Sequence, residues 1–323
     1  MAHELEIVNG QAMMAYAETE GKPWHGLGVA VSNDLTPAQM MKKAGLDWTV
    51  DKRPLYYNSL DNSHEVSGRQ ALVRSSDNTI MDIVGQDWNP VQNEEAFEFF
   101  SEYVLAGDMQ MSTAGALFGG SKIWALAKVK ESFDVLPGDQ IDSYLLFSNP
   151  HQYGKSIDVR FTPIRVVCSN TLSMSLSGSS TNAVKVNHRN EFNPDMVKDQ
   201  LGIASSKFAQ YKEVAQFLAS KRFSVDSMLE FYSSVFPHAS RKTPETVEQL
   251  SKPAKGCYEV LETQPGAEHA EGSFWQLINS VTFYTDHQAG RNANNRLNSA
   301  WFGANATRKN QAMDKAIELA NAA

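Results

Sequence analysis

A run of positive charges and amide side chains near the end of the chain is the first candidate for chemistry. From His287 to Met313 there is no Asp or Glu, although the whole chain carries a formal net charge of −8. Asn residues fill many of the gaps between four fixed cations: Arg291, Arg296, Arg308 and Lys309. Arg and Lys neutralise phosphates and Asn reads base edges, so this composition favours contact with nucleic acid.

A helix over residues 286–302 would arrange these polar side chains on two adjoining sides. One side would hold Asn292, Arg296 and Ser299, and the other would hold Arg291, Asn295 and Asn298. Trp301 would lie beside the apolar side, from which its ring could stack on an unpaired base. Two alternatives stay open: a contact between copies of the chain, where Arg and Trp are also enriched, and a solvated helix with Trp301 in the core.

Two further arginines lie in one strand-like segment. Their odd spacing places Arg160 and Arg165 on opposite faces of an unbroken strand. An Arg on a strand can hold a phosphate or a carboxylate with two parallel hydrogen bonds, so both are candidates for phosphate contact. For Arg160, an internal salt bridge to Asp158 or Glu98 is an equal alternative. Tyr57, in an aromatic strand-like run, is a second candidate for base stacking.

Signatures of catalysis and of metal binding are missing from the sequence. The segment GALFGGSK fails the spacing of a phosphate-binding loop and indicates a tight hairpin instead. No H-E-x-x-H, C-x-x-C or G-x-S-x-G pattern occurs, and the His residues lack ligand spacing. An enzyme that uses His25, His151 or Cys168 is a minor alternative, and we expect no catalytic residue, no metal and no cofactor.

Local signals predict the elements that would position these residues. Thr36 and Pro37 begin a short helix that ends at Gly45. Runs of β-branched and aromatic residues then predict antiparallel strands, with a hairpin tip at SSDNT. An amphipathic helix follows over residues 92–107, and a second hairpin turns at Gly119-Gly120.

From about residue 190 the hydrophobic periodicity becomes helical, and the two halves of the chain therefore differ. The sequence predicts an α+β fold whose first part, residues 1–187, is rich in antiparallel β-hairpins and has a crossing helix. The second part, residues 188–323, is mainly helical. Its Pro-, Gly-, Thr- and Glu-rich segment 237–272 predicts a mobile loop or linker.

Bulk composition limits the class of protein. The two cysteines, Cys168 and Cys257, are too few for a disulfide framework or a Cys-based metal cluster, and they fit a reducing cytoplasm. The start MAHELEIVNG is acidic where a signal peptide is basic, and no run of about 20 apolar residues predicts a membrane span. We expect a cytoplasmic protein with no membrane partner.

Six segments resemble, in this order, the phage/plasmid-like proteins of the domain of unknown function 932. They are PWHGLG, GLDWTV, VGQDWNPVQNEEAFEFF, TAGALFGGSKIWALAKV, TPIRVVCSNTLSMSL and GRNANNRLNSAWFGANATRKNQAMDKAIELA. The family usually carries HDGS before the fifth segment, whereas this chain reads NPHQYGKS, without an acidic neighbour for His151. The resemblance implies a protein of phages, plasmids or integrated elements, acting in the cytoplasm of the host cell.

These observations lead to one hypothesis and one alternative. The hypothesis is a homo-oligomer that binds single-stranded nucleic acid, with DNA expected, and supports recombination or replication without ATP. The cations named above would neutralise phosphates, and Trp301 or Tyr57 would stack on bases. The alternative is an interaction protein that contacts a host or defence factor through protein–protein contact.

Overall fold

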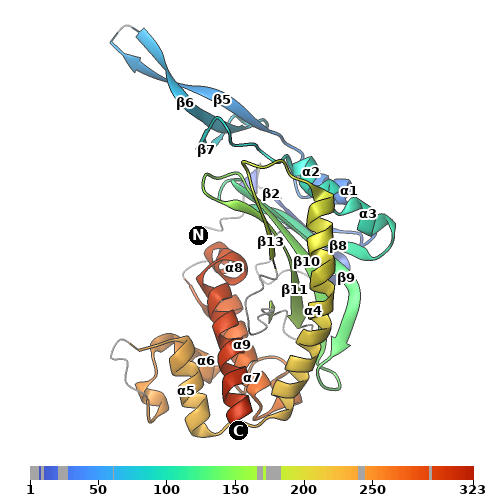
Figure 1. Cartoon of the computed structure of the whole chain (residues 1–323), viewed down its shortest axis with the longest axis vertical. Helices are drawn as coiled ribbons and strands as arrows, with labels where there is room; N and C mark the ends of the chain where they lie inside the picture. Colours follow the sequence, from blue (N-terminus) through green and yellow to red (C-terminus); the bar gives the residue numbers. More distant parts are fainter. Residues whose placement is uncertain are drawn as a thin grey trace. The chain divides into compact units, whose positions relative to one another are not determined.

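The computed structural model describes most of the chain, and its strands precede most of its helices in the sequence. The described residues are 7–8, 11–20, 28–60, 62–165, 170–171, 183–238, 244–290 and 293–323. Strands pair mainly antiparallel in the first part and helices fill the last part, as Figure 1 shows. The predicted α+β class is therefore confirmed.

The chain divides into two compact units, and each unit takes several segments of the sequence. The first comprises Met1–Val129, Leu145–Arg160 and Ala183–Leu201, and the second comprises Lys130–Tyr144, Phe161–Asn182 and Gly202–Ala323. A single boundary near residue 187 does not describe this division, because residues 130–144 and 161–182 group with the helices.

The largest sheet has eight strands in the order β12-β11-β10-β9-β8-β3-β4, and β13 also pairs with β11. Its strands are β3 (Met14–Ala17), β4 (Val29–Val31), β8 (Met109–Leu117), β9 (Lys122–Asp134), β10 (Gln140–Pro150), β11 (Ser156–Arg165), β12 (Asn170–Thr171) and β13 (Ala183–Asn187). A short antiparallel pair joins β1 (Ile7–Val8) to β2 (Gln11–Ala12). The predicted hairpin between β8 and β9 turns through Gly119 and Gly120, both at positive φ.

A three-stranded sheet of the first unit ends in a long exposed ribbon. It consists of β5 (Val50–Ser59), β6 (Asn62–Arg74) and β7 (Ile80–Gly85), and the SSDNT turn joins β6 to β7 as predicted. At the base, Ala71, Leu72 and Val73 are buried. Figure 1 shows that β5 and β6 continue past β7 as a two-stranded ribbon, and most of its residues are exposed on both faces. We call residues 54–60 and 62–69 the ribbon.

Three short helices belong to the first unit, and capping residues explain where the first one begins. Helix α1 (Pro37–Lys43) begins at Thr36, whose side chain and that of Gln39 cap each other's backbone, and it ends before Gly45. The predicted helix over 92–107 is divided into α2 (Asn93–Glu98) and α3 (Ser101–Leu105). Phe97, on α2, is buried, whereas Leu105, at the end of α3, is exposed.

The second unit has a helical core. It contains α5 (Val225–Val235), α6 (Lys252–Glu259), α7 (Phe274–Phe283), the π-helical turn η4 (Tyr284–Gln288), α8 (Ala293–Phe302) and α9 (Ala304–Ala322), together with most of α4 (Pro194–Ser220). Short 3-10 turns are η1 (Glu18–Glu20), η2 (Val247–Gln249) and η3 (Ala267–Ala270). Trp275 lies at 0% exposure in this core, and its indole nitrogen donates to Oδ2 of Asp139 at 2.9 Å. Within the described ranges, every helix is too short or too polar to cross a membrane.

The segment 237–272 differs from its prediction. Residues 244–272 form η2, α6 and η3, and Leu250, Ala254, Cys257 and Leu261 are buried in the helical core. Pro253 occupies the first turn of α6, where a missing N–H costs nothing, and Ser251 caps that helix. The Pro and Gly content therefore marks helix starts and turns between short packed helices; residues 239–243 lie outside the described part.

Candidate nucleic-acid interface

Lys309 is the clearest departure from the basic surface expected near the end of the chain. Its side chain is only 2% exposed, and Nζ donates a hydrogen bond to Oδ1 of the buried Asp286 at 2.9 Å. This pair ties α9 to the π-helical turn that follows α7. Lys309 therefore neutralises a carboxylate of its own chain, and the expectation that it contacts phosphates was wrong.

We call residues 287–313, which contain no Asp or Glu, the basic window. Its other described arginines are half-buried and bonded within the chain. Nε of Arg296 donates to the carbonyl oxygen of Ala289 at 2.6 Å, and burial lowers the pKa of this guanidinium. Nη1 of Arg308 donates to Oδ1 of Asn305 at 3.0 Å, and its guanidinium lies 5.3 Å from the ring centre of Phe236. Each guanidinium is therefore partly engaged within the chain.

The rest of the window is divided between exposed and packed residues. Asn295 is exposed, as a contact residue must be. Trp301 is half-buried and lies edge-on to Phe302, with the ring centres 6.1 Å apart. Helix α8 (Ala293–Phe302) forms the second part of the helix predicted over residues 286–302, and Gly303 separates it from α9. Arg291 and Asn292 lie outside the described residues.

Arg160 makes the internal salt bridge that the sequence offered as an alternative. Its guanidinium binds both carboxylate oxygens of Asp158, with Nε 2.6 Å from Oδ1. The two residues are two apart on β11 and so share a face. The side chain of Arg165, and the whole of Trp24, His25 and Cys168, lie outside the described part.

His151 is a buried structural residue of the first unit. Nδ2 of Asn93 donates to the carbonyl oxygens of Leu46 and Trp48, so Oδ1 of Asn93 accepts from Nε2–H of His151 at 3.1 Å. His151 is 0% exposed, and burial lowers its pKa to about 3. It is therefore neutral near pH 7 and has no access to a substrate in solution.

The first unit has a second group of cations, on segments that are far apart in the sequence. Lys122, at the start of β9, lies within range of the charges of Lys155, before β11, and of Arg160 and Asp158 on β11, and β13 adds Lys185. Lys185 is directly opposite Asp158 in the β11–β13 register, and it is exposed, as is Lys155. We call Lys122, Lys155, Arg160 and Lys185 the cationic cluster.

Lys122 of this cluster has a strongly shifted pKa, and burial is the main cause. Burial, reinforced by the nearby charges of Lys155 and Arg160 and opposed by Asp158, lowers the pKa of Lys122 to about 8. Like charges held close together disfavour the protonated form, and a bound anion would relieve that repulsion. The cluster is thus suited to receive a phosphate or carboxylate from outside the chain.

An exposed aromatic ring lies in the same loop as one of these lysines. Tyr153 is 55% exposed in the turn between β10 and β11, two residues before Lys155. The guanidinium of Arg69, at the base of the ribbon, lies 5.9 Å from the centre of this ring. The backbone N–H of Tyr153 donates to Oδ2 of Asp82 at 2.7 Å, which fixes the turn against β7. One exposed ring is thereby placed beside the guanidinium of Arg69, in the same turn as Lys155.

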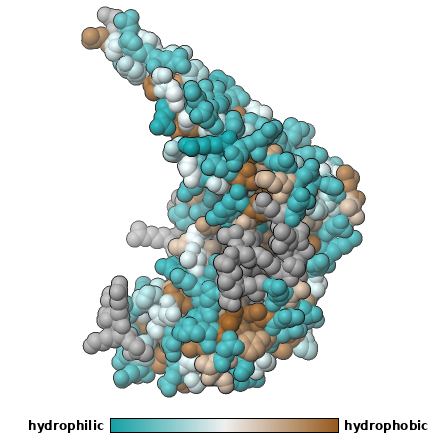
Figure 2. Space-filling view, in the orientation of Figure 1, coloured by the Kyte–Doolittle hydropathy of each residue, from teal (hydrophilic) through white to brown (hydrophobic). Residues whose placement is uncertain are grey.

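The ribbon carries a second aromatic surface. Tyr57 and His64 are opposite each other in the β5–β6 register, and their rings stack with centres 5.2 Å apart. Tyr57 is 55% exposed, so the predicted stacking residue is accessible. Figure 2 shows a largely hydrophilic ribbon with a hydrophobic colour at its far end, where Leu60 is fully exposed.

Sequence reasoning named Tyr57 and Arg160 as candidates and did not name Tyr153, Arg69 or the cluster lysines. Two signals could have found part of the site: YGK places an aromatic residue beside a cation in a Gly turn, and Lys185 alternates with buried valines in VKV. Their grouping in the cationic cluster depends on strand order, which no local pattern contains.

Comparison with known proteins gives one result. Residues 80–323 match the model of the family described as Domain of unknown function (DUF932). No curated protein and no solved structure matches the chain. The matched range includes the cationic cluster and Tyr153, whereas the ribbon precedes it. The match covers most of the sequence, and the chain belongs to the DUF932 family.

Proposed function

We propose that the protein binds single-stranded nucleic acid, DNA in the first place, through the cationic cluster and Tyr153 of its first unit. The observation that carries this proposal is the exposed ring of Tyr153, which lies 5.9 Å from the guanidinium of Arg69 and two residues before the exposed Lys155. A protein that holds a single strand without reading its sequence needs aromatic faces for the bases and cations for the backbone. This turn supplies both within one short segment.

The cluster supports the same proposal through its charge. The four cations of the cluster lie on neighbouring segments of a chain that is acidic as a whole, so an anionic backbone would be attracted locally and repelled elsewhere. The stacked rings of Tyr57 and His64 would extend the contact along the ribbon. We further propose, on the resemblance to phage and plasmid proteins, that a homo-oligomer uses this binding in recombination or replication without ATP.

Fluorescence anisotropy of a labelled single-stranded oligonucleotide tests the proposal. The wild-type protein should bind at low salt, and Tyr153→Ala should weaken binding by roughly 10-fold or more, because stacking on one ring contributes about 1–3 kcal/mol. Tyr258→Ala is a matched control, because Tyr258 is an exposed aromatic residue on α6 of the second unit. Absence of binding by the wild-type protein at low salt, or equal losses in both variants, would reject the proposal.

The same protein preparation can show which type of strand is bound and whether binding leads to annealing. Single-stranded DNA, single-stranded RNA and duplex DNA of one sequence should bind in decreasing order, since the duplex hides its base faces. Two complementary strands should anneal faster with the protein and without a nucleoside triphosphate. Binding without faster annealing would limit the function to strand protection.

A second candidate function rests on exposed apolar side chains of the three-stranded sheet. Tyr56, Leu60, Ile80 and Ile83 are all largely exposed. Apolar side chains on a projecting ribbon are also suited to a protein partner, which is the contact with a host or defence factor considered above. Leu60→Ser should then abolish capture of that partner and leave oligonucleotide affinity unchanged, whereas a nucleic-acid role predicts no partner that depends on Leu60.

A further inference from the structure

A pocket of about 830 Å³ lies in the first unit, beside α1. Its apolar part is formed by side chains such as Met13, Val29 and Leu35, and Ala44 and Trp48 contribute buried surface. A cavity of this volume is in the range that encloses a small organic molecule. Neither the cationic cluster nor Tyr153 belongs to its lining.

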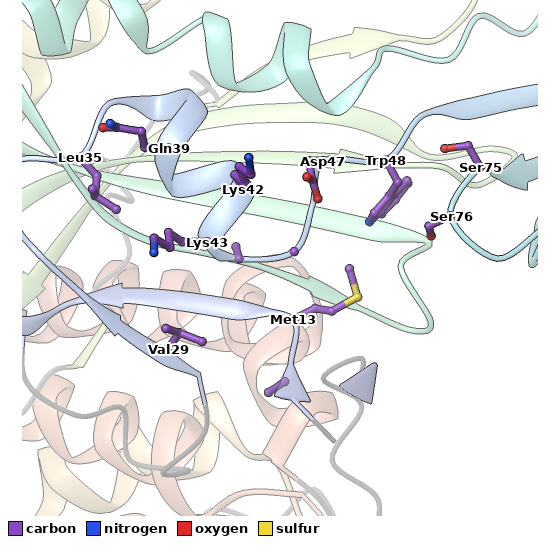
Figure 3. Close-up of a pocket in the computed structure, with 13 residues that line it drawn as sticks. Met13, Val29, Leu35, Gln39, Lys42, Lys43, Asp47, Trp48, Ser75 and Ser76 are labelled. Carbon is purple, nitrogen blue, oxygen red and sulfur yellow. The ribbon is translucent and has the colours of Figure 1, made fainter. Parts of the chain in front are cut away.

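Trp48 brings an unused hydrogen-bond donor to this pocket. The side chain is 5% exposed, and among the described residues its Nε1 has no hydrogen-bond partner. The ring itself is held, because the guanidinium of Arg74 lies 5.7 Å from its centre and His151 packs edge-on at 5.6 Å. Figure 3 shows the nitrogen at the end of the ring nearest Met13. A buried N–H without an acceptor costs free energy, which a bound acceptor would recover.

The rim of the pocket is charged. Lys42 and Lys43, in the last turn of α1, are exposed there, together with Asp47. Figure 3 shows Lys43 lying between α1 and Val29, on the pocket side of the helix. Ser75 and Ser76 add hydroxyl groups next to the Trp48 end. The rim can therefore bind an anionic group through lysine and a hydroxyl or amino group through Asp47.

We propose that this pocket binds a small organic acid that has a ring and hydroxyl groups, the chemistry of a nucleoside monophosphate. Lys43 and Lys42 hold the acidic group, Met13 and Val29 cover the ring, and an acceptor atom of the ligand receives the N–H of Trp48. Asp47 accepts from a ligand hydroxyl. This site is separate from strand binding, since it uses none of the residues proposed to contact the strand.

Isothermal titration calorimetry with three probes tests the proposal. AMP carries the ring, the hydroxyls and the phosphate, adenosine lacks the phosphate, and inorganic phosphate lacks the rest. AMP should bind saturably with one site per chain and at least 10-fold more tightly than either fragment. No saturable binding of AMP, or equal affinity for AMP and inorganic phosphate, would overturn the proposal.

Substitutions of pocket residues test whether AMP binds in this pocket. Trp48→Phe keeps the aromatic packing and removes the donor, so it should weaken AMP binding about 10-fold, the effect of removing one hydrogen bond. Lys43→Ala, at an exposed position that cannot disturb the core, should weaken it similarly, whereas Lys252→Ala on α6 should not. AMP binding that survives both pocket variants would place the ligand elsewhere.

Strand binding and AMP binding can be tested independently of each other. Trp48→Phe and Lys43→Ala should leave oligonucleotide anisotropy unchanged, and Tyr153→Ala should leave AMP binding unchanged. Loss of oligonucleotide binding in the pocket variants would make the pocket part of the strand site and overturn its independence.

Discussion

The ammonium group of Lys309 lies 2.9 Å from a carboxylate oxygen of Asp286, and both side chains are almost completely buried. The pair joins two elements that are 23 residues apart in the chain. Breaking a buried pair leaves one charge without compensation, which costs far more than losing a pair at the surface. The single lysine of the basic window thus stabilises the fold of the second unit.

Lys309→Met should lower the free energy of unfolding by about 3–5 kcal/mol, because the buried carboxylate of Asp286 loses the ammonium group that compensates its charge. Replacing both residues with apolar ones, Lys309→Met with Asp286→Leu, should recover most of that loss. Lys315→Met is the control, since its partners Glu230 and Glu318 are more than half exposed and such pairs contribute about 0–1 kcal/mol. Urea denaturation measures all three, and a loss below about 1 kcal/mol in the single Lys309 variant would contradict a structural role for the pair.

A second prediction concerns Gly256 in the middle of α6. Gly→Ala in an open helix stabilises by about 0.5–1 kcal/mol. Here a Cβ would lie 2.3 Å from Cε2 of Tyr284, so the ring must move and the substitution should destabilise by about 1–3 kcal/mol. In a Tyr284→Leu background the same substitution should become neutral or stabilising. A double-mutant cycle by thermal unfolding measures this coupling, and additive effects would show that the two residues do not meet.

A third prediction follows from the buried histidine. The pKa of His151 is lowered by burial from 6.5 to about 3, so the unfolded chain takes up a proton below pH 6.5 and the folded chain does not. The stabilisation is therefore fully present above pH 6.5 and is lost as pH falls toward 3, by an amount on the order of 4 kcal/mol. Burial lowers the pKa of His188 as well, which acts in the same direction.

His151→Gln separates this effect from general acid denaturation. Gln can keep a donor for Oδ1 of Asn93 but does not titrate, so the free energy of unfolding should fall less steeply between pH 6.5 and 4. His64→Gln, at an exposed position of the ribbon, should keep the wild-type pH dependence. Equal slopes for wild type and His151→Gln would remove His151 from the explanation.

The sequence predicted the local features of this fold well. The start and end of α1 follow from Thr36, Pro37 and Gly45, and the turns at SSDNT and Gly119-Gly120 follow from residues that accept tight turns. Each of these signals acts over a few residues, where backbone preference and capping decide the structure. The exposed ribbon could not be inferred, because its aromatic and aliphatic residues also fit a half-buried strand.

The candidate site depended on contacts between distant segments. The basic window starts one residue after Asp286. The partner of Lys309 therefore lies next to the window in the sequence but not inside it. Which charges meet is decided by the packing of α7 and α9. Likewise, Lys122, Lys155 and Lys185 converge through sheet order and register, and a single sequence does not specify either.

A fourth prediction uses the pKa of about 8 at Lys122. If this lysine contacts a phosphate, oligonucleotide affinity should fall as pH rises from 7 to 9, because Lys122 loses its proton across that interval. Lys122→Arg should bind with little change over the same range, since a guanidinium stays protonated. Affinity measured by anisotropy at constant ionic strength checks this, and an identical pH profile in both proteins would exclude Lys122 from the contact.

The salt dependence of oligonucleotide affinity tests the central claim most directly, because each phosphate contact contributes about 0.7 to the logarithmic slope for a single strand. Two double variants are compared with wild type: Lys155→Ala with Lys185→Ala in the cationic cluster, and Arg296→Ala with Arg308→Ala in the basic window. The first should flatten the slope by about 0.7 for each phosphate that is no longer neutralised, and the second should leave the slope unchanged. A flattened slope in the second variant alone, or in neither, would contradict strand binding by the cationic cluster.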